Sequence, residues 1–234
     1  MNSQKPYELE ICIDSLESAI GAQESGADRV ELCGRLDLDG LTPELEVIKK
    51  CRDLIDIGLH VMVRPNAGEF TVSEEQLALM LTTIDQCKSI GVNGVVFGAL
   101  DSGKNLDIEI LNRLQSSSSE LSVTFHRAFD VCQDPLKTFD ELGDLKVDRL
   151  LTSGQGNTAL EGIELIQELN SSTGQYPSIM VGSGVSADNI PEFWNVGIRQ
   201  YHFTSHVVDA NGKLIFDPAK TLAAKSVLES LCDT

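Results

Sequence analysis

The chain has few basic side chains. It carries 18 lysines and arginines against 36 aspartates and glutamates, so its formal net charge is −18 at pH 7. Nucleic acids and anionic membranes attract proteins through basic patches, which this composition does not favour. We therefore expect no nucleic-acid partner and no membrane partner, and we expect any anionic ligand to be bound by a few local groups.

Long apolar runs and paired cysteines are lacking as well. No stretch approaches the roughly 18 consecutive apolar residues of a membrane span, and the beginning, MNSQKPYELE, has no apolar signal core behind a basic segment. The six cysteines are scattered without C-x-x-C or zinc-ribbon spacing, which argues against a disulfide framework and a structural zinc site. These absences predict a soluble protein with free thiols in the reducing environment of the cytoplasm.

Short β-type runs alternate regularly with helical patterns. Eight strands are predicted, at residues 9–13, 29–33, 59–64, 94–98, 122–127, 149–153, 178–182 and 199–204. Apolar spacing of three to four residues predicts helices at 15–25, 43–54, 73–90, 107–117, 134–142, 157–169, 187–196 and 217–231. Eight β/α units in 234 residues most simply close into a (β/α)8 TIM barrel, a single α/β domain over residues 1–234, with an open doubly wound sheet as the alternative.

Local signals mark where these elements begin and end. Thr42, Ser73 and Ser186 stand where helix N-caps are expected. A similar four-residue sequence stands at the start of strands two, four, six and eight, at residues 26–29, 91–94, 146–149 and 197–200. This sequence predicts a helix end, a turn and a strand start, and its repetition at every second strand supports stacked βαβα units.

The strands turn many polar side chains toward the barrel interior. Their alternation places these residues inward: Glu10, Cys12, Asp14, Arg29, Glu31, Cys33, His60, Met62, Arg64, Thr124, His126, Arg149, Leu151, Ser153, Gln200, His202 and Thr204. Barrel interiors are mostly aliphatic, and buried charges require partners. The acids and arginines could neutralise one another as a structural network, or those near the C-terminal mouth could form a functional site. No lysine faces inward, which argues against a Schiff-base aldolase.

The C-terminal mouth collects the strongest functional candidates. Glu31, Arg64, His126 and His202 lie toward that end, and Arg127 follows the fifth strand. The loops at 152–156 and 181–185 are rich in glycine and serine, which let backbone N–H groups approach an anion. We predict that the five side chains converge and that Arg64 holds Glu31 ionised. The predicted anion-binding set is Arg64, Arg127, Ser153, Gly154, Gly182, Ser183 and Gly184.

Six segments carry a resemblance to a known family. They are LEICIDS at 9–15, GADRVELC at 26–33, HVMVRP at 60–65, GVVFGAL at 94–100, VTFHRAFD at 123–130 and LTSG at 151–154. Together they make the chain similar to the CutC proteins, which are known as copper homeostasis proteins. The resemblance implies a (β/α)8 barrel, an oligomer in the cytosol and a link to copper, with Cys12 and Cys33 as Cu(I) ligands.

Two hypotheses of different classes follow. In the first, the chain is a copper homeostasis protein whose inward Cys12, Cys33 and Met62 offer the soft sulfur ligands that Cu(I) prefers, although such residues also serve as ordinary core filling. In the second, it is a lyase- or isomerase-type enzyme acting on a small anionic or phosphorylated substrate, with Glu31, His126 and His202 as catalytic residues. No organic cofactor is indicated in either case.

Oligomerisation rests mainly on the resemblance. It implies a homodimer or a higher homo-oligomer. Phe70, Trp194 and Phe216 stand near loops or helix ends, where exposed aromatic side chains often anchor subunit interfaces. We therefore expect a dimer in solution.

Overall fold

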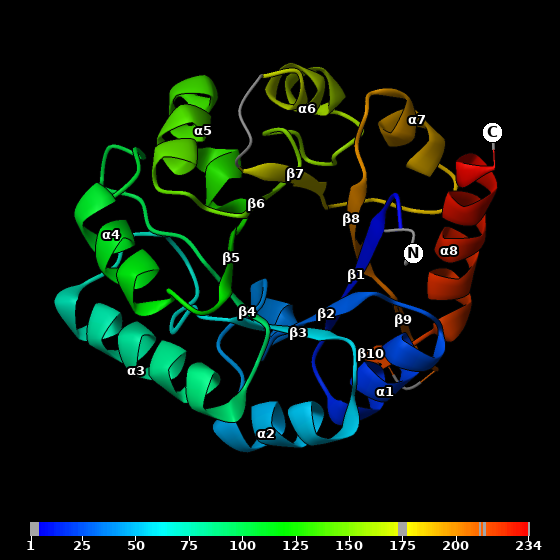
Figure 1. Cartoon of the computed structure of the whole chain (residues 1–234), viewed down its shortest axis with the longest axis horizontal. Coiled ribbons are helices and arrows are strands. Elements are labelled where there is room, and N and C mark those ends of the chain that lie inside the picture. The colour runs from blue at the N-terminus through cyan, green and yellow to red at the C-terminus, as the bar shows by residue number, and fades with distance from the viewer. Residues whose placement is uncertain (1–4, 173–176, 211, 213, 234) are drawn as a thin grey trace.

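The computed structural model describes residues 5–172, 177–210, 212 and 214–233, and its centre is a closed barrel of parallel strands. The strands are β1 (Glu8–Ile13), β2 (Arg29–Leu32), β3 (Gly58–Met62), β4 (Gly94–Phe97), β5 (Ser122–Phe125), β6 (Arg149–Thr152), β7 (Ser178–Val181) and β8 (Gln200–Thr204). They pair in chain order, and β8 pairs with β1 to complete the ring (Figure 1). The predicted (β/α)8 barrel is confirmed, because an open sheet would leave β1 and β8 as separate edges.

The helices form an outer layer around this barrel (Figure 1). They are α1 (Leu16–Glu24), α2 (Leu45–Leu54), α3 (Glu74–Ile90), α4 (Ile108–Ser117), α5 (Pro135–Asp144), α6 (Ile163–Asn170), α7 (Ile190–Asn195) and α8 (Pro218–Cys232), with short 3-10 helices at Leu36–Leu38 and Arg127–Val131. In the part of the chain that the structure describes, no helix combines the length and the apolar character needed to cross a membrane.

Two of the expected helix caps are wrong. The α2 helix begins at Leu45, and the Thr42 hydroxyl accepts a hydrogen bond from the backbone N–H of Arg64 instead of capping it. The α7 helix begins only at Ile190, since the Asn189 side chain accepts a hydrogen bond from the Ser186 N–H and forms a turn before it. At the first place the cap-type side chain holds a mouth loop, and at the second the turn formed by Ser186 and Asn189 delays the start of the helix.

The cap at Ser73 is confirmed. The Ser73 hydroxyl accepts from the backbone N–H of Gln76, and the Gln76 side chain accepts in return from the N–H of Ser73, which is a complete capping box. We predict that Ser73→Ala lowers the free energy of unfolding by about 1 kcal/mol in urea denaturation, because the N–H of Gln76 in the first turn of α3 loses its side-chain acceptor. Ser89→Ala on the same helix, whose hydroxyl only bonds the Asp85 carbonyl, should have a smaller effect.

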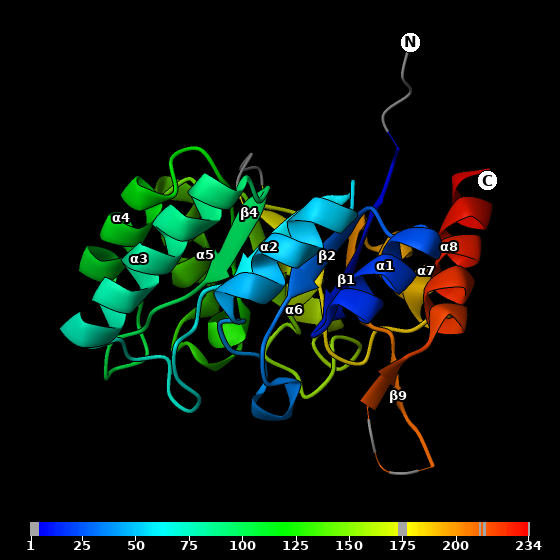
Figure 2. The ribbon, with the colours of Figure 1, turned by 90° about the horizontal axis from the view of Figure 1, so that it is seen from below.

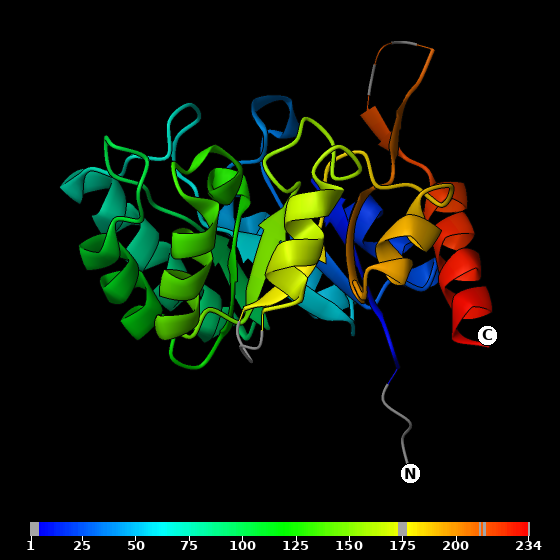
Figure 3. The same ribbon diagram turned by 90° about the horizontal axis from the view of Figure 1, so that it is seen from above.

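A short antiparallel hairpin was not predicted. Strands β9 (His206–Val208) and β10 (Leu214–Phe216) follow β8 directly and therefore stand at the carboxyl end of the barrel. The hairpin projects beyond the rest of the molecule at that end (Figures 2 and 3). It is held against α1, where a Cβ on Gly21 would meet the Phe216 ring at 2.7 Å and where His206 Nε2 lies 3.5 Å from Asp14.

The three aromatic side chains expected at a subunit interface all contact their own chain. Phe70 stacks near His126 with ring centroids 5.0 Å apart, Arg199 lies over the Trp194 ring, and Phe216 packs edge-on against His206. All three side chains are partly buried against their own chain, and the dimer stays a prediction.

The amino-terminal half of the barrel interior is an ion-pair network. The Arg29 guanidinium, which is 2% exposed, donates to Glu10, and its Nη1 lies 2.6 Å from Glu8. Arg149 donates to the Ser122 hydroxyl at 2.7 Å. Of the two interpretations of the inward charges, the structural one therefore describes Arg29 and Arg149, because each charge at this end has a polar or charged partner.

Candidate functional site

A cavity of about 560 Å³ opens at the carboxyl end of the barrel. The five side chains predicted to converge all line it: Glu31, Arg64, His126, Arg127 and His202. Cys12, Cys33 and Met62 lie at its inner wall, and apolar side chains, among them Val131, Leu151 and Leu214, line the rest. Its volume falls in the range of about 300–1,000 Å³ that is usual for small-molecule sites.

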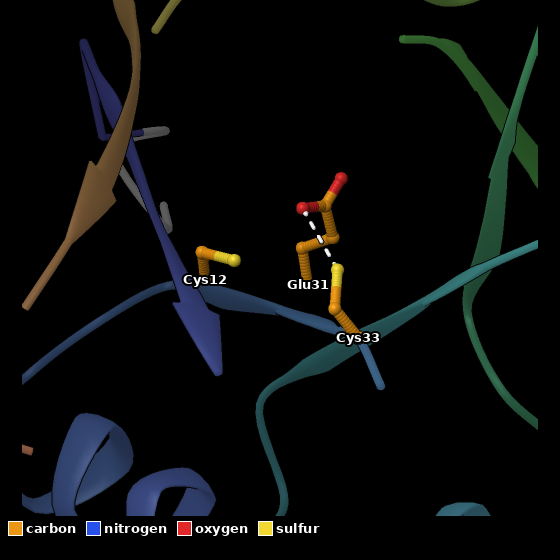
Figure 4. Close-up of side chains that lie close together, drawn as sticks. All are labelled: Cys12, Glu31 and Cys33. Carbon is orange, nitrogen blue, oxygen red and sulfur yellow. Dashed lines mark hydrogen bonds between the residues drawn. The ribbon is translucent and has the colours of Figure 1, made fainter. Parts of the chain in front are cut away.

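Two thiols and a carboxylate meet at the floor of this cavity. Cys12 is on β1, opposite Glu31 on β2, and Cys33 directly follows β2, where its N–H continues the ladder to Ile13. One ligand atom from each of Cys12, Glu31 and Cys33 lies within 4.8 Å of the others, and the Cys33 thiol donates to Glu31 at 3.4 Å (Figure 4). The two cysteines that strand alternation places inward therefore lie together, with their sulfurs within 4.8 Å of each other.

The two thiols have opposite acidities. The neighbouring Cys33 thiol lowers the pKa of Cys12 to about 5, against the effect of burial, and the nearby His202 lowers it further. The pKa of Cys33 is raised by its position beside Cys12, by burial and by the charge of Glu31. Of the two sulfurs, Cys12 is therefore the more readily ionised.

His202 connects this floor to the ion pairs below it. Its Nδ1 hydrogen-bonds Glu10 Oε1 at 2.7 Å, and its Nε2 lies 3.8 Å from Glu31. Burial opposes a charge on His202, but Glu31, Cys12 and Glu10 together raise the pKa of the imidazole well above its usual value. Glu10, which Arg29 and His202 both contact, has its pKa lowered well below the usual range in spite of complete burial. The imidazolium is thus held by an ionised carboxylate.

Glu31 brings a polar atom without a hydrogen-bond partner to the cavity. Burial raises the pKa of this carboxyl to about 8, since the opposing charge of His202 does not offset the desolvation. Within the described residues, its Oε1 atom is buried and has no hydrogen-bond partner. A buried polar atom without a partner is costly, so this oxygen is placed to contact whatever enters the cavity.

Arg64 does not pair with Glu31, and that prediction is wrong. Its Nη1 donates to the carbonyls of Leu38, Asp39 and Gly40 at 3.2–3.3 Å, and its Nη2 donates to the carbonyl of Gly68 at 3.1 Å. The guanidinium therefore holds two mouth loops together. The strand alternation placed the side chain correctly but could not show which loop carbonyls would surround it.

His126 is neutral. Burial lowers the pKa of the imidazole to about 3, and the nearby charge of Arg64 lowers it in the same direction. Its Nδ1 accepts a hydrogen bond from the Ala128 N–H at 3.2 Å, which fixes the ring at the start of the 3-10 helix. Asp130 does not set its charge, because that carboxylate accepts hydrogen bonds from Thr152 and Ser153.

The predicted anion-binding residues divide into two groups. Arg64, Arg127, Ser183 and Gly184 line the cavity, whereas Ser153, Gly154 and Gly182 are not among its lining residues. Ser153 is held by Asp130, and Gly154 packs so closely on Gly162 that a Cβ there would meet its carbonyl oxygen at 2.2 Å. Gly154 therefore lies in a turn that packs against Gly162 and is not part of the cavity lining. An anion at Arg127 and the Gly184 loop stays a prediction.

Glu10 is the residue that the sequence interpretation placed correctly but did not assign to the site. Closure of the barrel pairs β1 with β8 in a register that sets Glu10 opposite His202. The signal was present, since both residues have inward parity and the first and last strands of a closed barrel must be neighbours.

Gly40 shapes the Cys33 side of the cavity. Its φ is +83°, and a Cβ there would lie 3.1 Å from the Cys33 sulfur. We predict that Gly40→Ala lowers the free energy of unfolding by about 1–3 kcal/mol through backbone strain and also displaces the Cys33 thiol. Gly68→Ala is the matched control, because Gly68 has φ +97° but open space around it. Both variants should lose stability in urea denaturation, and only Gly40→Ala should change the reactivity of Cys33 toward a thiol reagent.

Comparison with known proteins gives a consistent result. The model of the CutC family matches residues 7–207. A family protein CutC from Glaesserella parasuis is 40% identical over 198 residues, which are 84% of this chain and 82% of that protein, and one from Enterobacter sp. (strain 638) is 42% identical over 194 residues, 83% and 78%. A Streptococcus agalactiae crystal structure, described as a copper homeostasis protein CutC, superposes with a TM-score of 0.79 at 31% identity, over 84% of this chain and 97% of that one.

Proposed function

The chain belongs to the CutC family, and from this membership and the paired sulfurs we propose that it binds Cu(I) through Cys12 and Cys33 in the cytosol as part of copper homeostasis. The observation that carries the proposal is the approach of two buried sulfurs from neighbouring strands (Figure 4). Thiolates are soft ligands, and soft ligands select Cu(I) over the hard cations of the cell.

The residues fit such an ion in number and chemistry. With metal–sulfur bonds of about 2.3 Å, two thiolates on one ion stand no more than roughly 4.6 Å apart, close to the separation that the side chains already have. Met62 packs in the same small cluster as Cys12, Cys33 and Val96 and offers a thioether as a third soft donor. Cys12, whose pKa is lowered, gives up its proton to a metal ion more readily than Cys33 does.

The neighbouring groups favour a monovalent ion. Glu31 and His202 are also near, and a site of two cysteines, a histidine and a carboxylate would suit Zn²⁺ as well. However, the Nδ1 of His202 is committed to Glu10, and burial raises the pKa of Glu31, which disfavours the ionised carboxylate that Zn²⁺ would bind. The donors that remain are the sulfurs.

The test is a titration of the metal-free protein with Cu(I) against a chromophoric Cu(I) chelator, with Zn²⁺ titrated in parallel. We expect one Cu(I) per chain and a much weaker response to Zn²⁺. A stoichiometry well above one, or binding that a carboxylate competitor such as citrate removes, would instead indicate adsorption to the acidic surface. Tighter binding of Zn²⁺ than of Cu(I) would contradict the proposal.

A further inference from the structure

The wall of the cavity across from the two sulfurs carries groups that copper binding does not use. His126 follows the end of β5, which lies across the barrel from β1 because the eight strands pair in chain order (Figure 1). The Nδ1 of His126 accepts a hydrogen bond from the Ala128 N–H at 3.2 Å. A backbone N–H can only donate, so Nδ1 carries no proton, and the proton of the neutral ring is on Nε2. His126 therefore offers one N–H donor, at Nε2.

This donor has no acceptor in the part of the chain that the structure describes, since the one hydrogen bond of the ring is made by Nδ1. His126 is 4% exposed, and it lines both the 560 Å³ cavity and a second cavity of about 280 Å³. Gly98 makes room for the ring, because a Cβ there would lie 2.5 Å from the His126 Cε1 atom. A buried donor without an acceptor is costly, so Nε2 is placed to bind an oxygen atom of a ligand.

Two arginines give the same cavity a positive charge. Among the described residues, Arg64 donates to backbone carbonyls and forms no ion pair, although it is only 9% exposed. A buried charge normally has a counter-charge, and an anion in the cavity would supply it. Arg127 uses its Nε on Asp130 and its Nη2 on Ser153, which leaves Nη1 with no partner in the described chain. Both arginines line the cavity.

We propose that His126, Arg64 and Arg127 bind a small α-keto acid with an apolar chain in the 560 Å³ cavity. Arg64 supplies the counter-charge of the carboxylate, and Arg127 Nη1 donates to it in a charge-assisted hydrogen bond. His126 Nε2 donates to the keto oxygen on the next carbon. A neutral donor beside charged donors matches a neutral acceptor beside a carboxylate, which is the pattern of an α-keto acid. The chain of the ligand packs on the apolar wall at Val131 and Leu151.

The probe is α-ketoisocaproate, added to the copper-free full-length protein with isotope-labelled histidine rings. NMR should show the His126 proton on Nε2, and the Nε2 signal should shift on addition of the acid until the site is saturated. In calorimetry, isocaproate, which lacks the keto oxygen, should bind about 3- to 10-fold more weakly, the usual contribution of a neutral hydrogen bond. A proton on Nδ1, equal affinity for the two acids, or the absence of saturable binding would each overturn the proposal.

A variant of His126 tests the contact with the keto oxygen. In His126→Asn the side-chain oxygen can still accept from the Ala128 N–H, but no N–H reaches the position of Nε2. The folded variant should therefore bind α-ketoisocaproate and isocaproate with equal affinity. A preference for the keto acid that survives this substitution would refute the role of His126. If the variant does not fold, the comparison of the two acids in the unmodified protein still decides.

A pair of arginine variants tests the contact with the carboxylate. Arg127→Gln should weaken both acids by about 10- to 100-fold, because a charge-assisted hydrogen bond is lost. Arg113→Gln is the matched control, since Arg113 is 43% exposed and pairs with Glu74, as Arg127 is 44% exposed and pairs with Asp130. It should leave both affinities unchanged, and equal weakening in the two variants would overturn the site. All these measurements use copper-free protein, so none depends on Cu(I) binding.

Discussion

Cys33→Ser is expected to lower the affinity for Cu(I) by more than about 100-fold, beyond the 10–100-fold that changes in the supporting shell of a metal site usually cost. The substitution keeps the size of the side chain, but it replaces one of two soft donors by a hard oxygen. The fold should be unaffected, since Cys33 belongs to a cluster of only a few side chains beside the main core. Competition with a Cu(I) chelator measures the change.

Cys132→Ser is the control for this experiment. Cys132 is buried like Cys33, yet its sulfur accepts from the Gln155 amide and lies outside the group of Cys12, Glu31 and Cys33. Its replacement should leave Cu(I) affinity unchanged. Equal losses in the two variants would show that the measurement follows general stability, and an undiminished affinity in Cys33→Ser would refute a two-sulfur site.

The barrel could be predicted from the sequence because its signals are local. Each strand is a short β-type run between turns. The four-residue sequence repeated at every second strand ends the preceding helix, because its Gly26, Gly91, Lys146 or Gly197 adopts a left-handed φ angle. Inward and outward residues could also be separated, since side chains alternate along a strand. That rule by itself assigns Cys12, Glu31, Cys33 and His202 to the barrel interior, and all four line the cavity.

What could not be predicted are contacts made by loops. Arg64 is surrounded by carbonyls of residues 38–40 and 68, and every residue type offers a backbone carbonyl, so no sequence pattern marks these partners. The β9–β10 hairpin escaped prediction for a related reason: its strands have three residues each, too few to show an alternation. The contact of Glu10 with His202 required one further step, the pairing of β1 with β8, which depends on barrel closure.

The interior ion pairs give the largest expected effect on stability. Arg29 is nearly inaccessible to solvent and is the partner of Glu10, which is fully buried. We predict that Arg29→Met lowers the free energy of unfolding by about 3–5 kcal/mol, because it leaves the Glu10 carboxylate in the interior with only His202 as a partner. The measurement is urea-induced unfolding with the same denaturant dependence in both proteins.

Two comparisons show whether the loss comes from a stranded charge. Arg35→Met removes an arginine whose pair with Asp37 is well exposed, with side-chain exposures of 62% and 63%, and it should have no measurable effect because solvent screens such a pair. Combining Arg29→Met with Glu10→Leu should recover most of the loss, since replacing both members of a buried pair by apolar side chains removes the desolvation cost along with the attraction. A double variant as unstable as Arg29→Met would mean that the guanidinium stabilises the barrel mainly through its packing and its contact with Met180. A single variant no less stable than Arg35→Met would contradict the prediction altogether.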